Sequence, residues 1–502
     1  MVNEILGFVA GRTFPHLVEV ISSRPLEVGD YVEIYAEKGP LLGMVDSSSI
    51  KSRLIEADKD FTTVRDAKTV AAKNPRDMSF SAKIRILGLI KMLASGIVEI
   101  PATPPKPGCE VYTASEDSLK NVFTKKEREW ASIGYLAREE NIYVSVNVDK
   151  LASRHLAILA ATGSGKSNLL ALIAKKVSEL NGTMVIFDYH GEYGNLELET
   201  KNPVQPKISP RYLDSEEFAD VMDVRESASH QRGILAECLT KEVREAKDFW
   251  EELKLAISKK TEDSKRKGPA LRLLEIVERA RRRMGQILDP DFDMPLRMMK
   301  PNKINIVDML ELTEKQANVL LGYYLEEILE DRKKATRKLW NQDSEEVYTF
   351  PSPVICAIEE AHTFIPQDEE TRAKYAAAKV AREGRKFGLS LVIISQRPSR
   401  IDQDVLSQMG SMAVMRIIQP ADQNYIVGVS ENLSEEIANY LPSLNTGEAI
   451  LLGQWVTVPV LVKIFKVGEK LTGSDISAVK KWEEERERKQ IAKEKTSELI
   501  EW

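Results

Sequence analysis

The sequence predicts an α/β protein with a small β-barrel at its N-terminus and a helical insertion within its main domain. Residues 1–105 contain short segments rich in β-branched and aromatic residues, separated by turn residues. From about residue 109, apolar runs of strand length alternate with helical segments, which is typical of a parallel sheet covered by helices. Between residues 214 and 300 this alternation stops, and helical spacing with dense charge replaces it.

Composition narrows the class of protein. The 502 residues are 43% hydrophobic and 29% charged, which indicates a globular chain of about three domains. No apolar run approaches the ~18 residues that cross a bilayer, so we expect no membrane span. Three cysteines lie far apart and outside any CxxC spacing, and the N-terminus lacks a secretion signal, which favours a reducing cytoplasm. The net charge of −6 means that any contact with nucleic acid must come from local clusters of Lys and Arg.

The first domain is predicted to be the barrel. We expect its strands at residues 5–10, 17–21, 31–35, 41–45 and within 84–100. Four prolines in residues 101–108 cannot join a helix or a central strand, because proline has no backbone N–H. We therefore predict a rigid linker at 101–108 and end the domain at residue 105.

The main domain is predicted to be one sheet that the insertion interrupts. Its first part covers residues 109–213, with a strand at 156–160, a helix at 166–180 and a strand at 183–188. The helical insertion covers 214–300. The second part covers 301–465, with strands at 304–307, 354–358, 389–394 and 412–417. Residues 466–502 are dense in charges of both signs and predict a charged helical tail, either solvated or packed on a partner.

A phosphate-binding loop is the strongest local signal. The run from Ala160 to Ser167, AATGSGKS, lies between a predicted strand and helix and matches the P-loop except that Ala160 replaces the first Gly. Backbone N–H groups at a helix N-terminus can surround a β-phosphate, Lys166 would reach the β- and γ-phosphates, and Ser167 would bind Mg²⁺. A chance Gly/Ser loop is the alternative. The predicted ATP-binding residues are Thr162, Gly163, Ser164, Gly165, Lys166, Ser167 and Asn168.

Two acids end the predicted strand at 354–358. We assign Glu359 to magnesium and Glu360 to the general base that activates the attacking water. Many P-loop enzymes have Asp at the first position, and an exposed acidic strand end is the alternative. The strand at 389–394 ends at Gln396, which we expect to sense the γ-phosphate if this strand lies between the other two; otherwise Gln396 only satisfies a turn before Pro398. Together these features predict a RecA-like P-loop ATPase core.

Arginines can complete such a site from a neighbouring subunit. Arg385 is our first candidate for this trans contact and Arg154 the second; a surface salt bridge is an equal explanation for either. Only about a hundred residues follow Gln396, too few for a second RecA-like lobe, so we infer a ring.

Three further segments carry open alternatives. Residues 188–193 are either near the nucleotide or a structural turn. The basic clusters at 259–267 and 279–283 alternate with acids, which favours a solvated face over a DNA contact. Arg397 and Arg400 follow the sensor strand and are candidate phosphate contacts.

Several segments together resemble the HerA family of the HerA/FtsK group of ATPases. They are the N-terminal β segment and residues 154–167, 188–193, 359–362, 382–388 and 394–398. The match spans nearly the whole chain. It implies an archaeal hexameric ring, a β-barrel cap of the kind named for HerA and ATP synthase, double-stranded DNA in the pore, and partnership with the nuclease NurA in end resection. FtsK itself would add membrane segments and a winged helix, and the sequence shows neither.

We therefore predict an ATP-driven, ring-forming double-stranded DNA translocase or helicase that works with a nuclease in double-strand break repair. A P-loop pump or assembly ATPase that moves protein or conjugative DNA has the same core and is the main alternative. A non-motor nucleotide switch is the second; substitutions of Lys166 and Glu360 would separate it from an enzyme.

Overall fold

The computed structural model describes residues 5–55, 59–74, 76–285, 287–292, 296–340, 347–430 and 433–468. The N-terminal part forms a closed antiparallel barrel in the order β1-β2-β5-β4-β3-β6, which confirms the predicted barrel. Its strands are β1 (Ile5–Ala10), β2 (Leu17–Ser22), β3 (Tyr31–Ala36), β4 (Gly39–Ser52), β5 (Met78–Leu89) and β6 (Glu110–Thr113). Alternate side chains along β2 are buried, which is the pattern that closes a barrel around its own core.

The predicted domain end at residue 105 is too early. Strand β6 closes the barrel between β1 and β3, so the barrel continues to Thr113. The proline-rich segment is also part of this domain, because Gly108 N donates to Val9 O at 2.8 Å and Val9 N donates to Cys109 O at 2.9 Å. Proline prevents strand pairing only at its own positions, and pairing resumes directly after the last one.

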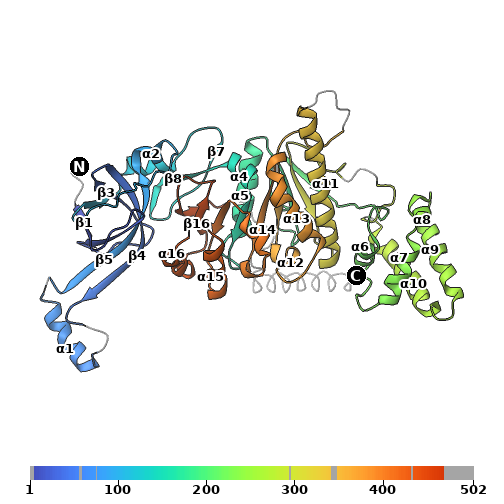
Figure 1. The fold of residues 1–502 in the computed structure, drawn as a ribbon, viewed down its shortest axis with the longest axis horizontal. Helices are drawn as coiled ribbons and strands as arrows, with labels where there is room; N and C mark the ends of the chain where they lie inside the picture. The colour runs from blue at the N-terminus through green and yellow to red at the C-terminus, as the bar shows by residue number, and fades with distance from the viewer. Residues whose placement is uncertain are drawn as a thin grey trace, which may run out of the picture.

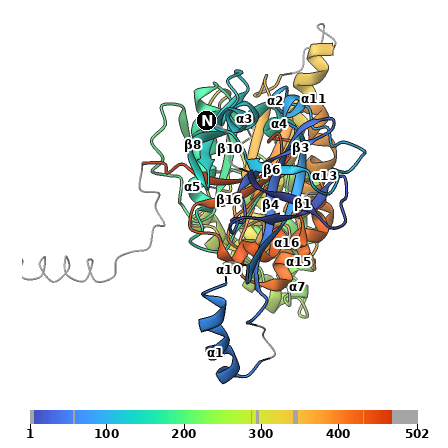
Figure 2. The ribbon, with the colours of Figure 1, turned by 90° about the vertical axis from the view of Figure 1, so that its left-hand side faces the viewer.

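A long hairpin extends from the barrel. Strands β4 and β5 continue past the barrel wall and carry helix α1 (Phe61–Ala71) at their far end, so that this arm projects from the molecule (Figures 1 and 2). Asp60 caps the helix by accepting from the amides of Thr62 and Thr63. The sequence reading did not anticipate this arm.

The main domain is built on an eleven-stranded sheet in the order β11-β12-β10-β13-β14-β9-β15-β16-β17-β7-β8. In this spatial order, the strands from β11 through β15 each pair in parallel with their neighbours. The pairs from β15 through β8 are antiparallel. Strand β14 lies between β13 and β9, as the sensor prediction required. The strands are β7 (Trp130–Leu136), β8 (Glu139–Asn147), β9 (Leu156–Leu159), β10 (Thr183–Asp188), β11 (Lys201–Val204), β12 (Ile304–Asp308), β13 (Val354–Ile358), β14 (Leu389–Ser395), β15 (Ser411–Val414), β16 (Glu448–Gly453) and β17 (Val460–Ile464).

Helices cover this sheet. Helix α13 packs on β14 and on the long helix α11, while α5 packs on β10 and β7. The elements on and around the sheet are α2 (Ile90–Ala94), α3 (Glu116–Phe123), α4 (Val148–Arg154), α5 (Lys166–Glu179), α11 (Glu314–Trp340), α12 (Ala361–Phe364), α13 (Arg372–Glu383), α14 (Gln403–Ser407), α15 (Pro420–Val429), α16 (Glu435–Tyr440) and the short 3-10 helices η2 (Gly384–Phe387), η3 (Pro398–Arg400) and η4 (Leu441–Ser443).

The predicted insertion is helical and lies at the end of the molecule opposite the barrel (Figure 1). Rings of Phe218, Phe249 and Trp250 pack against one another and form part of its core. Its helices are α6 (Ser215–Val221), α7 (Ser229–Cys238), α8 (Lys241–Glu245), α9 (Phe249–Lys259) and α10 (Lys267–Met284), with η1 (Lys260–Glu262) between the last two.

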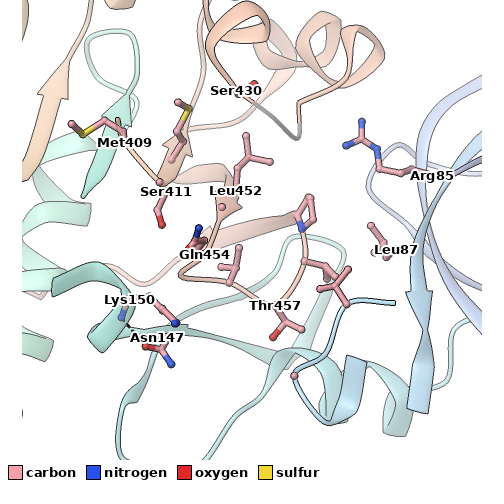
Figure 3. A pocket seen from close by; sticks show the side chains of 18 of the residues that line it. Arg85, Leu87, Asn147, Lys150, Met409, Ser411, Ser430, Leu452, Gln454 and Thr457 are labelled. Carbon is pink, nitrogen blue, oxygen red and sulfur yellow. Dashed lines mark hydrogen bonds between the residues drawn. The ribbon is translucent and has the colours of Figure 1, made fainter. Parts of the chain in front are cut away.

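The barrel packs directly on the main domain. Tyr31, Leu42 and Leu87 of the barrel belong to the same buried apolar cluster as the central sheet. A cavity of about 630 Å³ lies along this junction, with Arg85 and Leu87 on one side (Figure 3). Its other side is formed at the amino end of β15, so the cavity contains none of the predicted nucleotide-binding residues.

Two expectations concern the remaining chain. The charged tail predicted at 466–502 lies outside the described residues beyond Gly468. In the part of the chain that the structure describes, no helix is both long and apolar enough to cross a membrane.

Candidate nucleotide-binding site

The P-loop connects β9 to α5. Gly163 and Gly165 have φ values of 74° and 111°, in the left-handed region that glycine tolerates best. A Cβ on Gly165 would also come within 3.2 Å of Met415 Cε. Ala160 is fully buried and does not have a positive φ, so this position needs no glycine. The departure from the usual P-loop pattern therefore leaves the loop geometry intact.

Two distant segments support the loop. Ala161 N donates to Arg416 O at 2.8 Å, at the carboxyl end of β15. Gly447 N, in the turn before β16, donates to Ser164 O at 2.9 Å. These bonds fix the loop backbone from the side away from β14. They were not predicted, because neither segment carries a local sequence pattern.

Lys166 begins helix α5 and turns back across the loop. Its Nζ donates to Ala160 O at 3.3 Å. Burial lowers the pKa of the ammonium group, and the nearby carboxylates of Glu360 and Glu192 oppose that shift. An ammonium group on the first residue of a helix, beside its N-terminal amides, is positioned to bind phosphate oxygens.

Glu359 ends β13 and is only 5% exposed. Burial raises the pKa of its carboxyl well above the usual value, and the charges of Asp188 and Glu192 raise it further. Its Oε2 atom is buried and has no hydrogen-bond partner among the described residues. A divalent cation would relieve both the missing partner and the like-charge repulsion, so the donors present here fit Mg²⁺.

Within the described ranges, no group of three or more His, Cys, Asp or Glu side chains is arranged to bind a metal ion. A magnesium bound by Ser167, Glu359, phosphate oxygens and water does not need such a group, because Mg²⁺ in these sites keeps several waters.

Glu360 follows directly and has an unusual backbone. Its φ and ψ are 46° and 45°, a left-handed conformation that is costly for a side chain with a Cβ. His190 Nε2 lies 3.7 Å from Oε1 and His362 Nδ1 lies 3.2 Å from Oε2. Burial alone would raise the pKa of Glu360, but the nearby rings of His190 and His362 and the charge of Lys166 outweigh it and lower the pKa. The side chain is therefore an ionised carboxylate, as a general base must be.

Residues 188–193 form a turn that lies at this site. Asp188 accepts hydrogen bonds from the amides of Glu192 and Tyr193 at 2.9 and 3.0 Å. The turn brings His190 next to Glu360 and places Glu192 near Lys166. The segment is a structural turn, and this turn also positions polar side chains beside Glu360 and Lys166. His190, Glu192 and His362 were not predicted as site residues.

Gln396 lies directly after β14. Thr162 Oγ1 donates to Gln396 Oε1 at 2.5 Å, which joins the sensor position to the P-loop. Asn168 differs from the expectation, since its side chain binds the C-terminal segment: Nδ2 donates to Phe465 O at 2.8 Å and Val467 N donates to Oδ1 at 2.9 Å. Only the backbone of Asn168 remains free for a nucleotide.

Arg154 and Arg385 lie at the amino ends of the parallel strands, opposite the carboxyl ends that hold the P-loop. Arg154 precedes β9 and Arg385 precedes β14, whereas the P-loop and Gln396 follow these strands. Strand β14 has seven residues, roughly 23 Å at about 3.3 Å per residue. Neither arginine therefore belongs to the nucleotide site of its own chain.

His155 connects the two arginine segments. Its Nδ1 accepts from Leu391 N at 2.9 Å, so the ring proton is on Nε2, which donates to Ala381 O at 3.2 Å. The ring thus ties the residue after Arg154 to both the end of α13 and strand β14. The two arginine-bearing segments are consequently fixed relative to each other.

Three members of the basic clusters in the insertion are paired with acids. Arg281 contacts Glu251 at 2.9 Å. Lys260 and Arg266 both contact Glu237, at 2.6 and 2.7 Å. This arrangement agrees with the solvated face that the charge pattern favoured.

Comparisons with known proteins agree over most of the chain. Residues 131–328 match the family model described as the central domain of helicase HerA. The chain is 35% identical over 497 residues to a DNA double-strand break repair helicase HerA from Sulfolobus acidocaldarius, covering 96% of this chain and 97% of that protein. It is 33% identical to a protein of the same description from Saccharolobus solfataricus, covering 97% and 98%. Among solved structures, VirB4 of Thermoanaerobacter pseudethanolicus aligns with a TM-score of 0.47 at 16% identity, covering 68% of this chain and 98% of that one. The chain belongs to the HerA helicase family.

Proposed function

We propose that this protein is an ATP-driven double-stranded DNA translocase or helicase that works as a homohexameric ring with a NurA-type nuclease in DNA end resection. One observation carries the ATPase part of the proposal. The groups needed for hydrolysis gather at the carboxyl edge of the sheet, and the two candidate arginines lie at the opposite edge. Such a chain completes its site only when a second copy is next to it. We expect the protein to act in the cytoplasm.

The P-loop would bind the ATP phosphates through its backbone amides, with Lys166 turning from Ala160 O to the β- and γ-phosphates. Ser167 and Glu359 would hold the magnesium ion, which neutralises phosphate charge when bound. Thr162 keeps Gln396 beside the loop, where its amide can contact the γ-phosphate. The Glu360 carboxylate accepts a proton from the attacking water.

The arginine contact belongs to the interface between subunits. Arg385 is exposed and Arg154 is half-buried, and His155 fixes the segments that carry them. A guanidinium from this edge would enter the neighbour's site and balance the charge that develops on the transferred phosphoryl group.

DNA binding should depend on assembly. Because the net charge is −6, a single chain does not attract phosphates as a whole, and a ring is needed to gather sparse basic side chains around a duplex. The relatives named above are DNA double-strand break repair helicases, which supports DNA as the cargo.

The barrel is the proposed docking site for the nuclease. None of its described residues contributes to the candidate nucleotide site, and the arm of β4, α1 and β5 extends from it with Phe61 81% exposed. Replacing the arm by a short turn should weaken nuclease binding while ATP turnover is retained. Unchanged nuclease binding would place docking elsewhere.

The decisive experiment measures ATP turnover against duplex DNA and salt, using an oligomer whose size has been verified. Duplex DNA should raise turnover, and log K for DNA should fall with log salt by about 0.9 per phosphate contact. Turnover that responds to a protein cargo but not to DNA would favour the pump or assembly ATPase. A salt slope near zero would exclude DNA held by phosphates in a pore.

A further inference from the structure

The P-loop lies between two halves of the main sheet. Glu360 and Gln396, which act at the γ-phosphate in the proposed site, follow β13 and β14 on one side of β9. Strands β15, β16, β17, β7 and β8 lie on the other side of β9. The P-loop amides hold the α- and β-phosphates between these halves. A triphosphate whose γ-phosphate is next to Gln396 therefore directs its nucleoside toward the five strands on the other side.

The first turn of α5 is joined to the end of β17 on that side. Asn168 follows Lys166 and Ser167 in this turn, so its backbone amide is next to those that would hold the α- and β-phosphates. The Asn168 side chain binds the segment after β17 twice: Nδ2 donates to Phe465 O at 2.8 Å, and Val467 N donates to Oδ1 at 2.9 Å. The chain at Phe465 is thus held beside the place where the α-phosphate would lie.

Three aromatic rings gather at this point. The centroid of the Phe465 ring lies 6.2 Å from that of Tyr135 and 6.0 Å from that of Tyr143. Tyr135 and Tyr143 are paired across β7 and β8, so their side chains leave the sheet on the same face. Tyr143 is 52% exposed, and the other two residues are half-buried. Tyr135, Tyr143 and Phe465 therefore form an open aromatic surface, which we call the aromatic platform.

The platform and the P-loop are connected on one face of the sheet. Lys463 pairs with Tyr135 across β17 and β7, so its side chain leaves the sheet on the platform face. Its Nζ donates to Thr446 O at 2.7 Å. The next residue, Gly447, donates through its backbone N to Ser164 O at 2.9 Å. A side chain on the platform face thus reaches the turn that supports the P-loop.

We propose that the aromatic platform binds the base of ATP by stacking. The phosphates run along the P-loop from Gln396 to the Asn168 amide, and the ribose connects them to a base that lies on Phe465 and Tyr143. Stacking accepts any base, because every base has a π-face. A purine covers more of the platform than a pyrimidine, so purine triphosphates are preferred. The inference rests on the proposed binding of ATP at the P-loop, and it adds the part of the site that holds the nucleoside.

Two substitutions test the platform in the full-length oligomer without DNA. Tyr143→Ala and Phe465→Leu each remove a stacking face and should raise KM for ATP by about 5- to 20-fold. Their kcat should stay near the wild-type value, because the base is bound equally in the ground state and the transition state. Both variants should also reduce the preference for ATP over CTP, measured as the ratio of the kcat/KM values. Tyr143→Phe keeps the ring and should match the wild type.

Inorganic tripolyphosphate separates base stacking from support of the P-loop. It has the phosphates of ATP but no base, so the wild type, Tyr143→Ala and Phe465→Leu should bind it with equal affinity. Tyr212→Ala, at another exposed tyrosine, is the matched control and should leave all these values unchanged. Tripolyphosphate binding that weakens as much as ATP binding would show that the rings only support the loop. That result, or an unchanged KM and ATP-to-CTP ratio, would overturn the proposal. A wild-type oligomer that binds no ATP would instead contradict the proposed function itself.

Discussion

At the scale of single residues, Glu360 combines backbone strain with an ionised side chain. A left-handed conformation at a residue with a Cβ costs about 1–3 kcal/mol, and it persists where surrounding contacts enforce it. Here the strand before it is fully buried and two histidines lie beside its carboxylate. The charge of Lys166 acts on this carboxylate, so the strained backbone leaves Glu360 close to the P-loop lysine.

Replacing Glu360 by Gln tests this assignment. Glutamine has the same shape and should keep the backbone, but it cannot accept the proton of water, so hydrolysis should fall by about 10²–10⁴-fold while ATP stays bound. Single-turnover hydrolysis and nucleotide retention measure the two effects. Lys166→Ala is the matched comparison and should lose nucleotide binding or hydrolysis. Hydrolysis at the wild-type rate in Glu360→Gln would remove Glu360 from its role.

His155 predicts a pH dependence of stability. Burial lowers its pKa to about 4, against about 6.5 for an exposed histidine. As pH falls from 6.5 toward 4 the unfolded chain binds a proton that the folded chain does not, so the stability contribution is lost with falling pH. The free energy of unfolding should drop by about 2 kcal/mol between pH 7 and pH 5 from this residue.

Denaturant unfolding at these two pH values checks the prediction. His155→Gln should be less stable at pH 7 but should lose less stability on acidification. Substitution of His16, which is exposed in the barrel, should leave the wild-type slope unchanged. Equal slopes in the wild type and His155→Gln would show that His155 is not the titrating group.

At the scale of elements, the central parallel strands of the main sheet could be predicted from the sequence, and the antiparallel strands of that sheet could not. Strands β9, β10, β13 and β14 are buried on both faces and therefore read as continuous apolar runs. Strand β8 begins with three exposed residues at the sheet edge, and the arm on β4 and β5 extends beyond any core. Such elements are defined by their partners rather than by their own hydrophobicity.

The features of the candidate nucleotide site also divide into those that could be predicted from the sequence and those that could not. Lys166, Glu359, Glu360 and Gln396 lie in short motifs next to buried strands, so the sequence alone could propose them as site residues. Arg416 O reaches the P-loop from a strand that follows much later in the chain, and no local pattern reports that contact. His362 was visible only as part of a motif, because its relation to Ser395 depends on the pairing of β13 with β14.

Asn168 lies on helix α5, and the hydrogen bonds of its side chain predict a structural role rather than a nucleotide-binding one. Asn168→Ala removes two hydrogen bonds to the segment at 465–467, about 1–3 kcal/mol in total, so this segment should detach more easily. Limited proteolysis should show faster cleavage near Phe465, with a smaller change in KM for ATP than in Lys166→Ala. Asn195→Ala, at an exposed asparagine, is the control. Lost ATP binding with unchanged cleavage would make Asn168 a nucleotide ligand.

At the scale of the whole molecule, the barrel and the ATPase domain form a continuous structure. Apolar side chains of the barrel belong to the main core, and Lys83 contacts Glu436 across the junction at 3.0 Å. Ser434 Oγ also donates to Asp46 at 3.2 Å. Movement of the ATPase domain should therefore reach a partner on the barrel directly, which a free linker would not allow.

Subunit mixing tests whether the two edges of the sheet meet between chains. Arg385→Ala leaves the P-loop intact, and Lys166→Ala leaves the arginine intact, so each variant alone should be inactive in a ring. Mixed rings contain some interfaces where an intact Arg385 faces an intact Lys166, and those sites should recover part of the hydrolysis. Turnover should rise and then fall as the mixing ratio changes, because only unlike neighbours in one order restore a site.

Mass measurement must show that mixed rings form. Variants that stay inactive in verified mixed rings would contradict a site shared across the interface, and recovery with Arg154→Ala but not with Arg385→Ala would identify Arg154 as the arginine that acts in trans.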